Sequence, residues 1–459
     1  MAEIVRRAPY PDAKIENYFQ LPTIIEITED AEDEQLLQPV ARSGDDINSK
    51  LVVAASQGQI NLVEQLLHQG ASVNYGSKPF GATALMQEAA RGNVHMVKFL
   101  IEKGAHVNQA DDLGRTALMY AAMNGRDYVI KALLLAGAQL IAVDQKGMTA
   151  LMWAAKAKGD VVAVIKRLLH AGANVNTTNI YSRTALMFAV MKGNVHVIKL
   201  LLKAAANPNT VDYDQNTRLS SKTALMYAVQ RGNVEIVEIL IKAGVDVNIG
   251  GEYGTALTFA VIKGSVSISK MLIEAGADIN ARDWIYGWTV LMYANGNGHV
   301  DIVKILIEAG ADVSAADFAG RTVFMYAAAY GIVDSVKLLI EAGADVNAAD
   351  FVGGTALIYT AYVDYRERPS DYVDIVKILI EAGANVNAAD KWGQTALIVA
   401  AYGGYGDIVK ILIEAGADVN AADTSGCTAW NYAYSHAFAD IQVILLQAGA
   451  LANAFLSCY

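Results

Sequence analysis

Methionines, whose thioethers could bind a metal ion or a partner, recur at one position of a repeated phrase and do not cluster in one segment. Seven of its thirteen methionines follow the phrase Thr-Ala-Leu or a close variant. They are Met86, Met119, Met152, Met187, Met226, Met292 and Met325. Thioethers can bind soft metal ions, or they can line an adaptable binding face. The same register also holds Ile358 and Ile398, which favours an apolar filler, so we predict neither a metal site nor a cofactor.

The other reactive side chains show no catalytic spacing. The seven histidines are scattered, and none forms an HExxH motif or a Cys/His metal spacing. The glycine-bearing stretches 296–298 and 403–406 end helical patterns, and no strand precedes them, so they do not resemble phosphate-binding loops. We therefore predict that the chain is not an enzyme and has no catalytic residue.

These side chains lie on a unit that repeats about every 33 residues. Its opening hydroxyl residue stands at Ser49, Thr83, Thr116, Thr149, Thr184, Thr223, Thr255, Thr289, Thr322, Thr355, Thr395 and Thr428. The hydroxyl can cap a first helix, and a later Gly can end that helix in the left-handed conformation. A second amphipathic pattern follows, and the phrase ADVNAAD with its Asp and Gly predicts a short hairpin-like finger.

This period, together with the phrase Thr-Ala-Leu-Met-x-Ala, resembles the ankyrin repeat, whose signature is Thr-Pro-Leu-His-x-Ala. The resemblance covers residues 49–453. It implies an all-α solenoid of about twelve helix-turn-helix repeats with short hairpin-like fingers, in which each repeat is stabilised by stacking on its neighbours. The fingers and first helices are then expected to line a concave side. The first and last copies depart from the pattern, as capping repeats do.

The remaining segments complete the domain prediction. We expect residues 1–47 to form an acidic, proline-containing arm that is flexible or folded back over the basic repeats. Residues 48–453 form the repeat domain, and residues 454–459 form a C-terminal tail. Two cysteines are too few for a disulfide scaffold, and no apolar run is long enough for a spanning helix. We therefore expect a cytoplasmic monomer without membrane insertion.

Charge divides the repeats into a basic middle and an acidic second half. Residues 48–264 carry a net charge of +8, and residues 265–459 carry −12. Cations at the ends of the early first helices could form a basic groove: Arg91, Lys156, Lys158, Lys192, Arg231 and Lys263. An acidic ligand or a nucleic acid is the alternative partner for that row. Nucleic acid is disfavoured because the whole chain carries −11, and ordinary charged helix ends explain the row more simply.

Aromatic residues replace those cations in the later repeats. The helix ends and finger tips there are predicted to bind a partner through Trp284, Tyr286, Trp288, Phe318, Tyr330, Phe351, Tyr362, Trp392, Tyr402 and Tyr405. Large apolar side chains that cluster where water is expected often mark a protein interface. The main functional prediction is therefore a scaffold or adaptor that binds a protein partner on the concave face.

A second aromatic ladder stands one residue past the methionine register. Its members are Tyr120, Trp153, Phe188, Tyr227, Phe259, Tyr293, Tyr326, Tyr359 and Tyr432. Such a ladder could grip a partner, but we expect it mostly to pack between neighbouring helices.

The resemblance carries two further implications. The chain is similar to ankyrin proteins of bacteria, including intracellular ones that deliver such proteins into host cells. A secreted effector that binds host proteins in the host cytosol is therefore an alternative role. Some ankyrin repeats are also hydroxylated at the Asn of a Leu-x5-Asp-Val-Asn phrase, and Asn248, Asn347 and Asn420 fit that phrase.

Overall fold

The computed structural model describes residues 46–213, 221–362 and 369–452, which form α-helices joined by turns and isolated β-bridges. The described residues up to Gly251 make one compact unit, and those from Glu252 onward make a second. We call them the N-terminal unit and the C-terminal unit. Most of the predicted arm, residues 1–45, and the predicted tail at 454–459 lie outside the described residues.

The helices come in pairs, one pair to a repeat. In the N-terminal unit they are α1 (Ile47–Ser56), α2 (Ile60–His68), α3 (Ala84–Arg91), α4 (Val94–Glu102), α5 (Ala117–Met123), α6 (Asp127–Leu135), α7 (Ala150–Lys156), α8 (Val162–His170), α9 (Ala185–Lys192), α10 (Val195–Lys203), α11 (Ala224–Gln230) and α12 (Val234–Lys242). In the C-terminal unit they are α13 (Ala256–Ile262), α14 (Val266–Glu274), α15 (Val290–Gly296), α16 (Val300–Glu308), α17 (Val323–Ala329), α18 (Val333–Glu341), α19 (Ala356–Tyr362), α20 (Pro369–Glu381), α21 (Ala396–Gly403), α22 (Gly406–Glu414), α23 (Ala429–Ser435) and α24 (Ala439–Gln447). The predicted all-α repeat architecture is confirmed.

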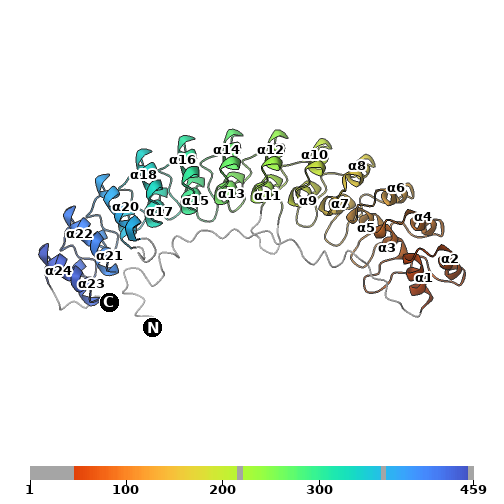
Figure 1. The fold of residues 1–459 in the computed structure, drawn as a ribbon, viewed down its shortest axis with the longest axis horizontal. Coiled ribbons are helices and arrows are strands. Elements are labelled where there is room, and N and C mark those ends of the chain that lie inside the picture. Colours follow the sequence, from red (N-terminus) through yellow and green to blue (C-terminus); the bar gives the residue numbers. More distant parts are fainter. Residues whose placement is uncertain (1–45, 214–220, 363–368, 453–459) are drawn as a thin grey trace. The chain divides into compact units, whose positions relative to one another are not determined.

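Within each unit, helices of the same kind pack side by side. In the N-terminal unit α5 contacts α3 and α7, while α6 contacts α4 and α8. In the C-terminal unit α17 likewise contacts α15 and α19, and α18 contacts α16 and α20. Figure 1 shows the odd-numbered and even-numbered helices of each unit as two rows. A single pair cannot bury both of its apolar faces, so each repeat is stabilised by its neighbours.

The repeat around Thr116 shows why each first helix begins and ends where it does. The Thr116 hydroxyl accepts the backbone N–H of Met119 at 3.5 Å and so caps α5. At the other end Gly125 takes a φ of 68°, which glycine adopts without the steric cost that a Cβ would bring. The chain then turns into α6, as the sequence pattern predicted.

The methionine register is buried between these helices. Met86, Met119 and Met226 each expose 1% or less of their surface. The sulfur of Met86 also accepts the backbone N–H of Thr83 at 3.4 Å, so this side chain helps to cap its own helix. Within the described residues, no three His, Cys, Asp or Glu side chains come together in a way that could hold a metal ion.

In seven of the described repeats a buried aspartate fixes the finger to the first helix that follows it. Asp317 accepts the backbone N–H groups of Ala319 and Arg321 through Oδ1, both at 2.8 Å. Its other oxygen, Oδ2, accepts the hydroxyl of Tyr326 on α17 at 2.6 Å. One carboxylate therefore shapes the finger turn and also attaches the turn to the helix. We call this arrangement the finger clamp.

The finger clamp recurs in both units. In each copy an aromatic side chain donates a hydrogen bond to the aspartate. The pairs are Tyr120 with Asp111, Trp153 with Asp144, Tyr227 with Asp212, Tyr293 with Asp283, Tyr326 with Asp317, Tyr359 with Asp350, and Tyr432 with Asp423. These donors are buried, so the second aromatic ladder packs inside the repeats as predicted. It does not form an exposed grip for a partner.

Burial keeps the clamp tyrosines protonated and able to donate. It raises the pKa of Tyr326 well above its usual value of 10.0, and the hydrogen bond to Asp317 raises this pKa further. A folded-state pKa above the unfolded one means that the clamp's contribution to stability is complete below the unfolded pKa. That contribution is lost only as the pH rises through the folded value. The clamp is therefore intact at neutral pH.

We expect Tyr326→Phe to loosen its finger, because one oxygen of the buried Asp317 carboxylate loses its donor. Leaving a buried acceptor unpaired costs about 1–3 kcal/mol. The measurement is native-state hydrogen exchange at the amides of Ala319 and Arg321, which should open more easily by that amount. The control is Tyr128→Phe, whose side chain is 75% exposed, and it should leave both amides unchanged. Equal exchange in all three proteins would contradict the clamp.

Candidate protein-binding surface

Four aromatic side chains at the finger tips of the C-terminal unit face solvent. Trp284 is 66% exposed, Tyr286 46%, Phe318 62% and Phe351 78%. Trp284, Phe318 and Phe351 each directly follow the clamp aspartate of their finger. They therefore occupy one register on three consecutive fingers. We call these four residues the fingertip row.

Backbone hydrogen bonds join the fingers that carry this row. The N–H of Phe318 donates to the carbonyl of Tyr286 at 3.0 Å, and that of Phe351 donates to Ala319 at 3.1 Å. The ring of Phe318 lies so close to Gly287 that a Cβ there would stand 2.7 Å from it. The ring of Phe351 lies equally close to Gly320. Each finger is thus seated on the one before it, and the row forms a continuous surface.

The first of these fingers is one residue longer than the next. Six positions separate Asp283 from the capping Thr289, whereas five separate Asp317 from Thr322. Asp283 absorbs the extra residue by accepting the N–H groups of Ile285 and Tyr286 through the same oxygen. Trp284, Ile285 and Tyr286 consequently stand exposed one after another.

The predicted exposure of Trp288 is wrong. Only 4% of its surface is accessible, because its ring packs edge-on against Tyr293 at 5.3 Å and against Tyr326 at 4.7 Å. Trp288 directly precedes the helix-capping Thr289, and its backbone N–H donates to Asp283. At that position the side chain points into the repeat, whereas a residue directly after the aspartate points out.

The other predicted partner-binding residues are half-buried. Tyr330 stacks on Tyr326 at 6.1 Å, and burial raises its pKa above the usual value. Tyr402 packs edge-on against Tyr432 and His436. Tyr362, Trp392 and Tyr405 are also of intermediate exposure. The rings of Tyr330 and Tyr402 thus take part in packing within the C-terminal unit, and the fingertip row is the most exposed part of the predicted surface.

The six residues predicted to form a basic groove differ in their surroundings, and the groove stays a prediction. Arg91 pairs with the buried Glu88 at 2.6 Å, and the ammonium of Lys156 stands 5.4 Å from the centre of the Trp153 ring. Lys192 lines an open cavity of about 620 Å³ with His196 and other residues. Lys158, Arg231 and Lys263 are exposed, and Lys263 belongs to the C-terminal unit, not the N-terminal one.

The sequence matches the family model of ankyrin repeats (3 copies) over residues 51–144, 129–212, 210–283, 285–350 and 353–455. The chain belongs to the ankyrin-repeat family. Ankyrin repeats are generally protein-interaction modules. Among curated proteins, an ankyrin repeat protein of Acanthamoeba polyphaga mimivirus is 47% identical over 49 residues. That match covers 11% of this chain and 30% of the viral protein, so less than a third of the relative's length is spanned.

Two of the three asparagines predicted as hydroxylation sites, Asn347 and Asn420, join neighbouring repeats through their side chains. The carboxamide of Asn347 donates to the carbonyl of Gly383 at 3.0 Å and accepts the N–H of Asn385 at 2.7 Å. Asn420 donates to Gly449 in the same way. The backbone N–H of Asn248 donates to Asp246. The carboxamides of Asn347 and Asn420 therefore have a structural role, and hydroxylation of all three asparagines stays a prediction.

The same register in the N-terminal unit holds two apolar side chains that the sequence reasoning missed. Ile180 follows the clamp position Asn179, and Tyr213 follows Asp212. Both are about half exposed, at 46% and 47%. The signal that could have found them is an apolar residue directly after the clamp position, because the side chain at that place in the finger points outward.

Truncation of the two tryptophans of one finger should change stability by very different amounts. Trp288→Ala removes a buried aromatic side chain and should destabilise the C-terminal unit by about 3–5 kcal/mol. Trp284→Ala removes an exposed one and should change stability by less than about 0.5 kcal/mol. Urea denaturation of the two full-length variants, followed by circular dichroism, measures the difference. Similar shifts for both variants would show that the two environments are alike.

Proposed function

We propose that this chain is a non-catalytic scaffold that docks a partner protein on the fingertip row of its C-terminal unit. The observation that carries the proposal is the set of four large aromatic side chains that remain exposed on adjoining fingers. Aromatic residues are favoured interface anchors because they bury much area at a low cost in conformational entropy.

The size and rigidity of the row support this function. Aromatic side chains bury about 150–250 Å² each, so the exposed parts of four could contribute on the order of 500 Å². A standard interface takes about 800 Å² from each partner. The hydrogen bonds between the fingers hold the rings in place before a partner arrives, which lowers the entropic cost of binding.

An acidic ligand on the basic row is the weaker candidate. The Arg91 guanidinium already neutralises Glu88, and Lys156 lies over Trp153. A ligand would compete with these contacts, whereas the outer faces of the fingertip row are free for a partner. The two modes also differ in salt dependence, because contacts between exposed charges are screened and aromatic contacts are not.

The test compares proteins retained by the immobilised full chain with those retained by a Trp284→Ala, Phe318→Ala, Phe351→Ala triple variant. Each lost anchor should cost about 1–2 kcal/mol, so the partner's affinity should fall at least about a hundredfold. The matched control truncates the same register elsewhere, through Asp112→Ala, Gln145→Ala and Thr424→Ala. It should retain the partner at wild-type levels.

Two outcomes would contradict the proposal. The triple variant could hold the same proteins with unchanged affinity, which would remove the fingertip row as the anchor. Retention could also survive the triple variant and fall steeply with added salt, which would favour the basic row.

A further inference from the structure

The outward side of α6 carries apolar side chains where most other repeats carry polar ones. Tyr128 is 75% exposed, Leu135 is 81% exposed, and Ile141 in the finger that follows is 83% exposed. Tyr128, Lys131 and Leu135 are spaced three and four residues apart, so they form one stripe on the helix. Neither this stripe nor Ile141 belongs to the surface proposed above, which lies in the C-terminal unit.

These residues depart from the chain's own pattern. The position of Leu135 holds Glu in α16, α18, α20 and α22 and Lys in α10 and α12. The position of Ile141 holds Asn in most repeats, and in the preceding finger this is Asn108, which donates to Gly137 and accepts from Gln139. Ile141 forgoes that inter-repeat hydrogen bond and gains little packing, because it is almost fully exposed. Stability of the repeat therefore does not explain either residue.

A row of lysines crosses the stripe at Lys131 and continues onto the neighbouring helices. Lys98, Lys131, Lys166 and Lys199 occupy one register on α4, α6, α8 and α10, and all four are exposed. These helices pack in sequence, each against the next. Helices in contact lie about 8–10 Å apart, so the four lysine positions follow one another at about that spacing. Lys199 at the end of the row also lies 4.0 Å from Glu235 of α12, and both side chains are more than half exposed.

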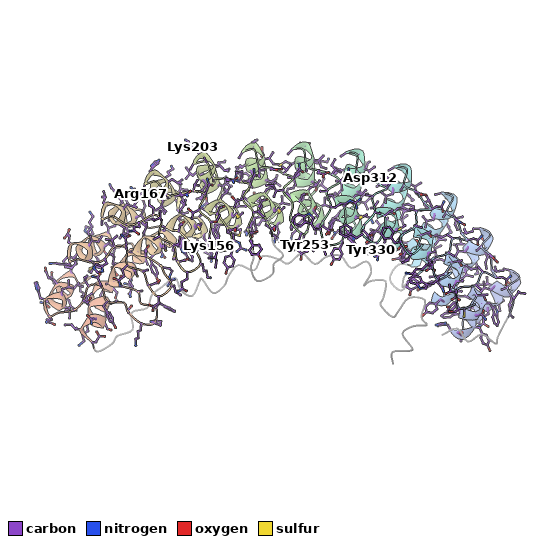
Figure 2. The ribbon with its side chains drawn as sticks, turned by 180° about the vertical axis from the view of Figure 1, so that it is seen from behind. Lys156, Arg167, Lys203, Tyr253, Asp312 and Tyr330 are labelled. Atoms are coloured by element: carbon purple, nitrogen blue, oxygen red, sulfur yellow. The ribbon has the colours of Figure 1, made fainter. Side chains whose placement is uncertain are left out.

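Acidic residues are scarce on this face. Asp127 is the one carboxylate within α6, α8 and α10, and Arg167 binds both of its oxygens, at 2.5 and 2.7 Å. Exposed Lys203 and His170 lie near the ends of α10 and α8. Figure 2 shows Arg167 and Lys203 on the outer side of the even-numbered helices, opposite Lys156. In α16, by contrast, Lys304 is accompanied by Asp301 and Glu308. We call the face of α6, α8 and α10, together with Ile141, the outer basic face.

We propose that the outer basic face binds an anionic lipid surface, with Leu135 and Ile141 entering the interface and the lysines meeting the headgroups. A lipid surface offers an extended plane of negative charge, which suits a row of lysines on parallel helices. Protruding apolar side chains can also insert between the lipids, and such insertion is required for binding in the interface plane. Within the described residues no helix has the length and apolar content to cross a bilayer. The contact is therefore made at the surface.

The exposure of the two aliphatic side chains favours lipid over an acidic protein segment. A groove that receives a peptide shields the residues lining it, whereas Leu135 and Ile141 are more than four-fifths exposed. A nucleic acid would use the lysines but would leave both aliphatic side chains in water. A lipid surface uses the charge and the protruding apolar groups together.

The experiment is flotation of the full chain with vesicles of phosphatidylcholine alone or with added phosphatidylserine. Binding should need the anionic lipid and should weaken with salt. Leu135→Glu with Ile141→Asn installs residues that the chain uses at these positions in other repeats, so the fold should be kept. This double variant should lower partitioning at least about tenfold. Lys131→Gln and Lys166→Gln should each lower it about fivefold.

Matched controls separate this surface from the rest of the chain. Lys337→Gln and Lys410→Gln change the same register in the C-terminal unit and should leave partitioning unchanged. The triple variant of the fingertip row should also bind vesicles normally, so this inference and the proposed docking function can fail independently. Circular dichroism melts confirm that each variant is folded.

Three outcomes would overturn the inference. Vesicles with and without phosphatidylserine could bind equally, or not at all. Binding could survive Leu135→Glu with Ile141→Asn, which would exclude insertion of the aliphatic side chains. The chain could bind polyglutamate but not anionic vesicles, which would assign the outer basic face to an acidic protein segment.

Discussion

The buried carboxylate of the finger clamp is the interaction on which the rest of this structure depends. A finger has few apolar residues of its own, so packing alone does not fix its turn. Asp317 supplies that order by accepting two backbone N–H groups of the finger and the hydroxyl of Tyr326. The carboxylate is tolerated in the interior because each of its oxygens has a donor. Removing the donor therefore affects the finger as well as the helix.

The clamp also explains why side chains at the finger tips are available to a partner. The backbone N–H and C=O groups of the turn form hydrogen bonds within the finger or with a neighbouring finger. For example, the N–H of Phe318 donates to the carbonyl of Tyr286. The side chain directly after the aspartate is not part of the clamp, and it varies between Asp112, Gln145, Trp284 and Phe351. A fixed backbone with a free side chain at each step allows one architecture to present different surfaces.

The sequence was sufficient for the helices but only partly for the surface. Period, caps and glycines are local signals, so the repeat and its helix boundaries could be predicted. Whether a tryptophan in a finger points inward depends on the register of the clamp, which joins residues nine to fifteen positions apart. Trp284 and Trp288 therefore looked alike in the sequence. Two repeats gave a visible hint that the aspartate and the aromatic donor belong together: Phe188 and Phe259 have no donor, and Asn179 and Gly250 replace the aspartate.

Several buried polar side chains of the C-terminal unit lack a hydrogen-bond partner within the described residues. Asn295 is completely buried, and neither polar atom of its side chain has a hydrogen-bond partner within the described residues. Ser269 and Ser335 are likewise buried without a partner, at positions where other second helices place Val or Ile. Each such group costs stability, and regions of low local stability open most readily. In the C-terminal unit these groups lower the stability of the core, while the hydrogen bonds between its fingers keep the fingertip row in place.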